Sequence, residues 1–130
     1  MIVLDVSATV DWLLQTTAGQ RIEHRIFSAK ESLHAPHLLD IEVTQVLRRL
    51  VREGAVSANR ASEAVQDLLD LQLIRYPHFV LLPRIWQLRQ NLSAYDAAYI
   101  GLAERLRAPL ITRDKRLAAA PGNAAVIELF

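Results

Sequence analysis

Two short apolar runs, each leading to an aspartate, constrain the fold of this chain most. The run 2–4 ends at Asp5, and the run 108–112 is followed closely by Asp114. Continuous apolar runs of this length are typical of strands that are buried on both faces. Long segments with helical periodicity separate the two runs, and strands that alternate with helices form parallel sheets. We therefore predict an α/β fold whose parallel sheet is covered by helices on both sides.

The remaining elements follow from periodicity and from the turn residues between them. Helices are expected at about 7–15, 20–29, 39–52, 57–71, 84–91 and 93–107. Further strands are expected at about 32–35, 79–82 and 125–127. No internal repeat or linker interrupts this order, and 130 residues is close to the usual size of one domain, so we expect a single domain over residues 1–130.

The composition excludes several classes of protein. Hydrophobic residues make up 52% of the chain and charged residues 22%, which is too apolar for a disordered protein. The absence of cysteine excludes disulfides, a thiolate nucleophile and a cysteine-based zinc site. The first residues lack a basic start, and no apolar stretch is long enough to span a membrane, so we expect a cytoplasmic protein without a membrane partner.

The charge balance limits how this chain could hold a polyanion. Fifteen basic and fourteen acidic residues give a net charge of +1, so the overall field would not attract a nucleic acid strongly. Contacts with phosphates would then depend on local basic patches and on a bound cation.

Two acids fall on the apolar faces of predicted helices. Glu42 lies within the apolar arc of one helix, and Asp96 lies within that of another. These arcs are formed by Leu39, Val43, Val46, Leu47 and Leu50 in the first helix and by Tyr95, Tyr99, Ile100, Leu102, Ala103 and Leu106 in the second. An inward carboxylate is costly unless it is paired, hydrogen-bonded or bound to metal, and no cationic partner lies on the same arcs.

Four acids are expected at one edge of the sheet. Asp5 and Asp114 follow strands, whereas Glu42 and Asp96 are expected in the first turns of helices that begin at the same edge. Ligands of open parallel sheets bind outside the carboxyl ends of the strands. Carboxylate oxygens suit Mg²⁺ or Mn²⁺, which recruit phosphate oxygens, so the pattern indicates a metal centre acting on phosphodiesters.

Ordinary structural roles remain open for each of these residues. Acids are favoured in first helical turns by capping and by the helix dipole, and Ser93 with Asp96 fits a capping box. Ser7 and Thr112 could be simple strand-end hydroxyls or could support metal ligands. The same fold could also act as a binding module without catalysis, or as an aspartate-based phosphoryl-transfer domain.

Basic and aromatic residues outside the acidic set have simpler interpretations. Arg113, Lys115 and Arg116 flank Asp114 and could contact phosphates or form a loop cluster of charges. The cluster of Arg48, Arg49 and Arg52 is expected to be a solvated helix face. Both tryptophans, Trp12 and Trp86, are expected in the core.

The order of four motifs resembles that of a known family. They are Val3-Leu4-Asp5-Val6-Ser7-Ala8, then Pro36 with Glu42-Val43, then Tyr95-Asp96-Ala97-Ala98-Tyr99 leading to Leu102-Ala103-Glu104, and finally Pro109-Leu110-Ile111-Thr112-Arg113-Asp114 with Leu117. Over nearly its whole length the chain resembles the PIN-domain family and, within it, the VapC toxins of bacterial toxin–antitoxin pairs.

The resemblance implies a function and a site. It implies a three-layer α/β/α sandwich with about five parallel strands, and an endoribonuclease toxin that cuts structured RNA such as tRNA or rRNA. It implies Mg²⁺ or Mn²⁺ held by Asp5, Glu42, Asp96 and Asp114, with Ser7 and Thr112 in support. It also implies a homodimer and a VapB-type antitoxin that covers the acidic cleft. Arg113, Lys115 and Arg116 are then candidate RNA contacts.

Overall fold

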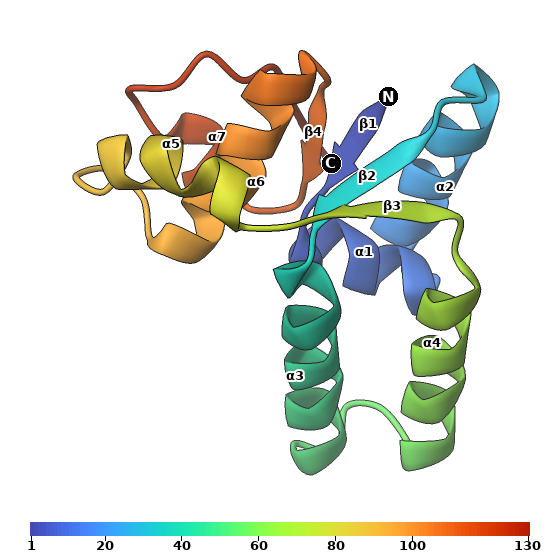
Figure 1. Ribbon diagram of the computed structural model, residues 1–130. Helices are drawn as coiled ribbons and strands as arrows, with labels where there is room; N and C mark the ends of the chain where they lie inside the picture. Colours follow the sequence, from blue (N-terminus) through green and yellow to red (C-terminus); the bar gives the residue numbers. More distant parts are fainter.

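The centre of the computed structural model, which describes residues 1–130, is a five-stranded parallel sheet in the order β3-β2-β1-β4-β5 (Figure 1). The strands are β1 (Ile2–Leu4), β2 (Leu33–Pro36), β3 (Leu73–Tyr76), β4 (Leu110–Thr112) and β5 (Ile127–Leu129). The first strand is central, and its residue Val3 is in register with His34 on one side and Leu110 on the other. The parallel sheet predicted from the apolar runs is confirmed.

The order of the strands reverses beside β1. The chain moves outward from β1 to β2 and β3, and then crosses back to the other side of β1 to form β4 and β5. Ligands of open parallel sheets bind at such a reversal, where the loops after the two central strands diverge. In this chain the residues that follow β1 and β4 therefore occupy the favoured position for a functional site.

Helices cover both faces of the sheet, as predicted. They are α1 (Val6–Leu13), α2 (Thr17–Ala29), α3 (Leu38–Arg52), α4 (Ala58–Asp70), the 3₁₀ turn η1 (Phe79–Leu81), α5 (Leu82–Gln87), α6 (Ala94–Leu106) and α7 (Lys115–Ala119). Helix α1 packs against α2, α3 and α4, whereas α6 packs against β1, β2 and β4 and carries α5 on its outer side (Figure 1). None of these helices has both the length and the apolar character needed to cross a membrane.

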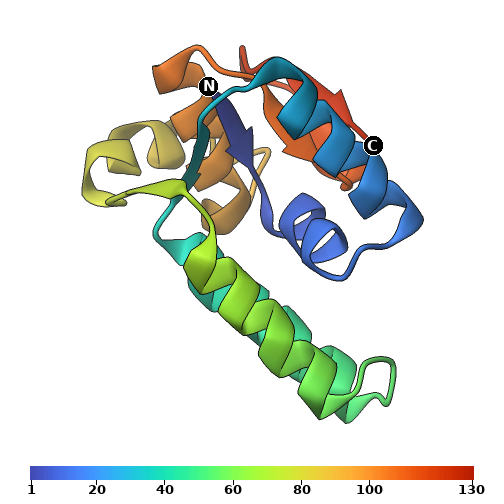
Figure 2. The same cartoon turned by 90° about the vertical axis from the view of Figure 1, so that its right-hand side faces the viewer.

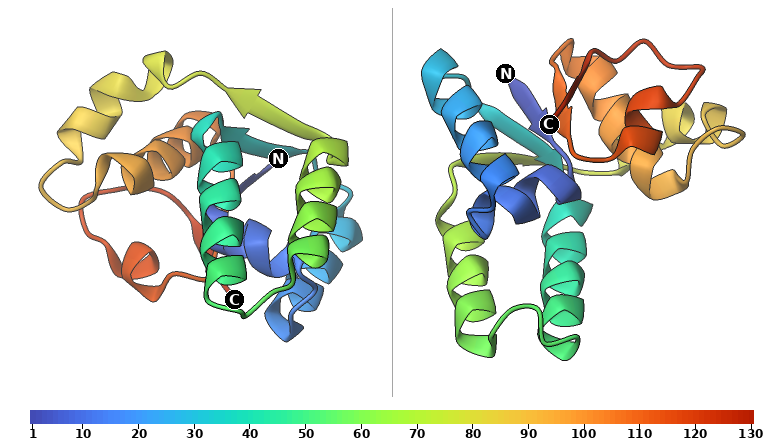
Figure 3. Two further views of the ribbon diagram at one scale, coloured as in Figure 1. Left: turned by 90° about the horizontal axis from the view of Figure 1, so that it is seen from below. Right: turned by 180° about the vertical axis from the view of Figure 1, so that it is seen from behind.

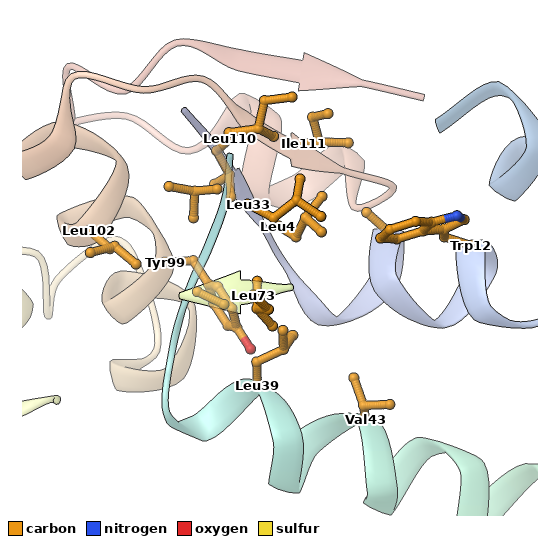
Figure 4. Packing of buried hydrophobic residues seen from close by; sticks show 14 of the residues in the cluster. Leu4, Trp12, Leu33, Leu39, Val43, Leu73, Tyr99, Leu102, Leu110 and Ile111 are labelled. Atoms are coloured by element: carbon orange, nitrogen blue, oxygen red, sulfur yellow. The ribbon is translucent and has the colours of Figure 1, made fainter. Parts of the chain in front are cut away.

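Helices α3 and α4 form an antiparallel hairpin that projects away from the sheet (Figures 2 and 3). The hairpin is anchored at its base, where Leu39 and Val43 join the core (Figure 4). The same core contains Leu4 and Ile111 from the central strands, and each fully buried side chain of this kind contributes about 1.5–3 kcal/mol. The base of α3 is therefore fixed against the sheet, and its far half packs on α4.

Three expected elements were placed or bounded wrongly. The predicted strand at 79–82 is a helical segment, and β3 lies earlier, at Leu73–Tyr76. Arg75 interrupts the apolar pattern of that strand, but its guanidinium is satisfied by a bidentate ion pair with Asp40 (2.6 and 3.0 Å).

The bounds of two other elements also differ from those expected. The last strand begins two residues later than expected. Helix α2 begins at Thr17 rather than near residue 20, because the Thr16 hydroxyl caps the helix by accepting from the Gly19 amide. The short helix α7 was not expected.

The prediction for Trp86 was also wrong, whereas Trp12 is buried as expected. Trp86 is 68% exposed. Arg84 and Leu88, which are one helical turn apart, face the body of the protein, because Arg84 pairs with Glu104 of α6 and Leu88 is buried. Trp86 therefore lies on the outer side of α5, where the Arg89 guanidinium stacks on its ring.

The junction between α1 and α2 provides a test of this packing. A Cβ atom on Gly19 would lie 1.9 Å from the carbonyl oxygen of Asp11, and backbone cannot move aside as a side chain can. We expect Gly19→Ala to lower the free energy of unfolding by about 2–4 kcal/mol, measured by chemical denaturation. Gly101→Ala is the matched control, because its Cβ would meet only the Arg84 side chain at 3.6 Å. Equal stability of the two variants would contradict this account.

Candidate active site

Asp5 lies at the end of β1 and is held from several directions. Its side chain caps α1, with Oδ1 accepting from the Ala8 amide at 2.9 Å and from the Ser7 hydroxyl at 2.8 Å. The Thr112 hydroxyl, at the end of β4, donates to Oδ2. Asp5 is only 3% exposed, so its carboxylate is fixed in orientation at the bottom of the site.

Ser7 and Thr112 join the loops that follow the two central strands. The Thr112 hydroxyl accepts from the amide of Asp114 at 2.9 Å, and the Ser7 hydroxyl accepts from the amide of Arg113 at 2.9 Å. Each hydroxyl thus contacts Asp5 on one side and the loop after β4 on the other. The two residues are more than strand-end hydroxyls, because together they connect Asp5 to the loop that carries Asp114.

Asp114 and Asp96 both stand at helix N-termini. Asp114 is the N-cap of α7, and its Oδ1 accepts from the Arg116 amide at 2.8 Å. Asp96 lies in the first turn of α6, where the Ser93 hydroxyl accepts from its amide at 3.1 Å. The serine cap expected from the sequence is present. Both acids are half-buried, so capping explains their location without excluding a further role.

Two expectations about the helices need correction. Glu42 lies in the second turn of α3, because the helix begins at Leu38, and the acid of its first turn is Asp40. Tyr95 was expected on the inward face of α6 but is 64% exposed. The first turn of α6 is not covered, and its continuous buried segment starts at Ala97.

The four acids influence one another electrostatically. Burial is the main cause that raises the pKa of Asp5, of Glu42 and of Asp96. The negative charge of Asp114 further raises the pKa of Asp5 and that of Asp96, while the charges of Asp96 and Asp5 raise the pKa of Glu42. Mutual repulsion therefore links all four carboxyl groups in one cluster, which we call the acidic cluster.

No ion pair neutralises Asp5, Glu42 or Asp96. The fourth acid, Asp114, pairs with Arg116, whose Nε lies 3.7 Å from Asp114 Oδ1 and whose side chain is 93% exposed. Partly buried carboxylates without a cationic partner are costly, and a divalent cation would remove that cost. The electrostatics of the acidic cluster therefore fit the binding of a positive ion.

The donor set fits Mg²⁺ or Mn²⁺ bound partly through water. Three carboxylate or histidine groups are not brought to one point at which they could hold an ion directly. Mg²⁺ commonly keeps several waters and uses only one or two carboxylates together with substrate phosphates. Four oxygen-bearing acids spread around the reversal point of the sheet are compatible with that mode of binding.

Of the three basic residues near Asp114, one has its charged group held by hydrogen bonds and two are exposed. The Arg113 guanidinium is held by Asp11 at 2.7 Å and by the carbonyl oxygen of Phe130 at 2.7 Å. Lys115 and Arg116 are exposed, and the positive charge of Arg116 only partly offsets the burial and the Asp114 charge that raise the pKa of Asp96. The cluster of Arg48, Arg49 and Arg52 on α3 is exposed, as expected for a solvated helix face.

Tyr99 was not identified as a site residue from the sequence. Its hydroxyl donates to Glu42 Oε1 at 2.8 Å, and its side chain is 1% exposed. It had been assigned only to the apolar face of α6. The available signal was its spacing, because Tyr99 follows Asp96 by three residues and so lies on the same side of the helix.

Sequence comparison identifies close relatives along almost the whole chain. The profile of the PIN domain family matches residues 2–123. Ribonuclease VapC1 from Mycobacterium tuberculosis is 44% identical over 129 residues, which cover 98% of this chain and 96% of that protein. Ribonuclease VapC9 from the same organism is 43% identical over 117 residues, which cover 90% and 88%.

Solved structures share the fold at lower sequence identity. PAE2754 from Pyrobaculum aerophilum superposes with a TM-score of 0.68 at 24% identity, covering 97% of this chain and 82% of that chain. VapBC2 from Rickettsia felis, bound to a DNA fragment from their promoter, gives a TM-score of 0.66 at 12% identity, covering 99% and 98%. Fold, length and sequence identity agree, and the chain belongs to the PIN-domain family and, within it, to the VapC ribonucleases.

Proposed function

We propose that this chain, as a single domain over residues 1–130, is a Mg²⁺- or Mn²⁺-dependent endoribonuclease that serves as the toxin of a VapBC-type pair. The observation that carries the proposal is the acidic cluster, in which four mutually repelling carboxyl groups surround the reversal point of the sheet without a buried cation. The identity of 40–44% to proteins named VapC ribonucleases supports the same activity.

The four acids of the cluster are proposed to have two different roles. Asp5 and Asp96 are proposed as direct metal ligands, with Ser7 and Thr112 keeping the Asp5 carboxylate oriented. Glu42 and Asp114 would act through water, as base or as outer support. A bound Mg²⁺ or Mn²⁺ would neutralise charge on the scissile phosphate and make a water molecule more acidic.

The proposed substrate is structured RNA such as tRNA or rRNA. With a net charge of only +1, the chain depends on local cations to hold a polyanion. The exposed side chains of Lys115 and Arg116 stand beside Asp114 and are suited to phosphate contacts. The Arg113 guanidinium could make such a contact only by giving up its bonds to Asp11 and Phe130.

The proposed partners are a VapB-type antitoxin and a second copy of the chain. The likeness to the VapBC2 structure supports the antitoxin. A homodimer would need an exposed apolar surface, and η1 and α5 present Phe79, Leu82 and Trp86 outward at helical spacing. An apolar stripe of this kind is unusual on a monomer.

Removal of a direct ligand should abolish metal-dependent cleavage. We expect purified wild-type chain to cut RNA with Mg²⁺ or Mn²⁺ and to stop with EDTA. Asp5→Asn should reduce the cleavage rate by about 100-fold or more. Changing a residue that only supports a metal ligand typically costs about 10- to 100-fold, and loss of a direct ligand should cost at least as much. Asp67→Asn, an exposed acid on α4, is the control. Cleavage that persists in EDTA or in Asp5→Asn would overturn the proposed mechanism.

The acidic cluster should also lower the free energy of unfolding of the metal-free protein. The pKa of Asp96 is raised in the folded state above its ordinary value of 3.8, so folding disfavours the ionised form. The free energy of unfolding therefore falls as pH rises from 3.8 through the raised pKa of Asp96, and the loss is complete once the pH is well above that pKa.

Asp96→Asn removes this cost. We expect it to raise the metal-free Tm at pH 7 by about 3–5 °C, which corresponds to about 1 kcal/mol. Added Mn²⁺ should raise the Tm of the wild type more than that of the variant. A lower metal-free Tm for Asp96→Asn than for the Asp67→Asn control would show that Asp96 is stabilising instead.

The proposed dimer should depend on the exposed stripe. We expect Trp86→Glu to convert a dimer into a monomer in size-exclusion chromatography with light scattering, because a buried unpaired carboxylate is costly at an interface. Leu69→Glu, which changes an equally exposed apolar residue on α4, should leave the dimer intact. A Trp86→Glu variant that remains dimeric would exclude this surface.

A further inference from the structure

We propose that Tyr99 is a positioning residue of the nuclease site, which holds Glu42 in the orientation needed to act on the metal or its water. The inference rests on the proposed function and adds a residue to it. Its geometrical basis is the hydrogen bond from the Tyr99 hydroxyl to Glu42 Oε1, at 2.8 Å. Figure 4 shows the hydroxyl of Tyr99 pointing from α6 toward the beginning of α3.

The bond joins two helices that each carry an acid of the cluster. Glu42 is on α3, and Asp96 is on α6, three residues before Tyr99. Tyr99 is 1% exposed and is surrounded by core residues, so its ring has little freedom to move. Helix α6 therefore carries one acid of the cluster, Asp96, and through Tyr99 it also fixes the position of a second acid, Glu42.

The bond also determines which oxygen of Glu42 remains available. Oε1 accepts from Tyr99, and no other hydrogen bond or ion pair engages the Glu42 carboxylate. Oε2 is consequently left to face a metal ion or a metal-bound water. Without Tyr99, a glutamate with three rotatable bonds on a half-buried helix face could turn either oxygen, or neither, toward the cluster.

The Tyr99 hydroxyl is the donor in its bond to an ionised Glu42. Burial and the negative charges of Glu42, Asp5 and Asp96 all raise the pKa of Tyr99, so the hydroxyl keeps its proton at neutral pH. A hydrogen bond donated to the ionised carboxylate favours the ionised form, so the bond from Tyr99 partly offsets the rise that burial causes in the pKa of Glu42. A core tyrosine with only a packing role would need no acid of the site as its partner.

The chain offers a matched control for the loss of one hydroxyl. The hydroxyl of Tyr76 forms a hydrogen bond with Nδ1 of His34 at 2.7 Å and makes none with a member of the acidic cluster. Tyr99→Phe and Tyr76→Phe therefore remove the same atom from two hydrogen-bonded tyrosines, and only the first change affects Glu42.

The experiment measures Mn²⁺ binding by calorimetry alongside RNA cleavage. We expect Tyr99→Phe to weaken Mn²⁺ binding by about 10-fold and to lower kcat with little change in the KM for RNA. Tyr76→Phe should bind Mn²⁺ as the wild type does. In a Glu42→Gln background, Tyr99→Phe should cause little further loss, because the residue acts through Glu42.

Several outcomes would overturn the inference. Wild-type Mn²⁺ affinity in Tyr99→Phe, or losses that add fully in the double variant, would show that Tyr99 only packs. Should Tyr99→Phe not fold, NMR of ring-labelled tyrosine in the wild type decides, because the Cζ signal of Tyr99 should shift with Mg²⁺ and that of Tyr76 should not. A wild type that neither binds Mn²⁺ nor cuts RNA would overturn the proposed function and this inference together.

Discussion

The bonds that Ser7 and Thr112 make to Asp5 are the interactions on which the rest of the site depends. They tie the ends of β1 and β4 together at the point where the strand order reverses. A buried carboxylate at that point is costly by itself, and the two hydroxyls with the Ala8 amide make it tolerable. The other three acids stand on separate elements, with Asp114 at the start of α7, Glu42 on α3 and Asp96 on α6.

Much of the fold and of the acidic set could be predicted because both depend on local patterns. Apolar runs revealed β1 and β4, and the inward placement of Glu42 and Asp96 followed from helical periodicity. What failed depended on partners distant in sequence. The strand β3 was missed because Arg75 interrupts its apolar pattern, and the ion pair with Asp40 that satisfies Arg75 joins residues 35 positions apart. Tyr99 was seen only as a core residue, since its bond to Glu42 spans 57 positions.

Surface and core aromatics show the same limit. An apolar pattern indicates which face of a helix points inward, but it does not show which turns of that face are covered by neighbouring elements. Tyr95 fits the apolar arc of α6, yet it lies in an uncovered first turn, and Trp86 lies on the outer side of α5 because Arg84 and Leu88 take the inner side. Arg113 is a similar case, because a charged residue beside Asp114 proved to be tied to α1 and to the end of β5.

The way the projecting hairpin is anchored decides where Glu42 lies. Glu42 is at the base of α3, between Leu39 and Val43, which are both buried in the core. The packing that attaches the hairpin to the body of the protein therefore also sets the position of this carboxylate, and the hydrogen bond from Tyr99 adds a second attachment at the same place. The far end of the hairpin, which points away from the sheet, carries none of the four acids (Figure 2).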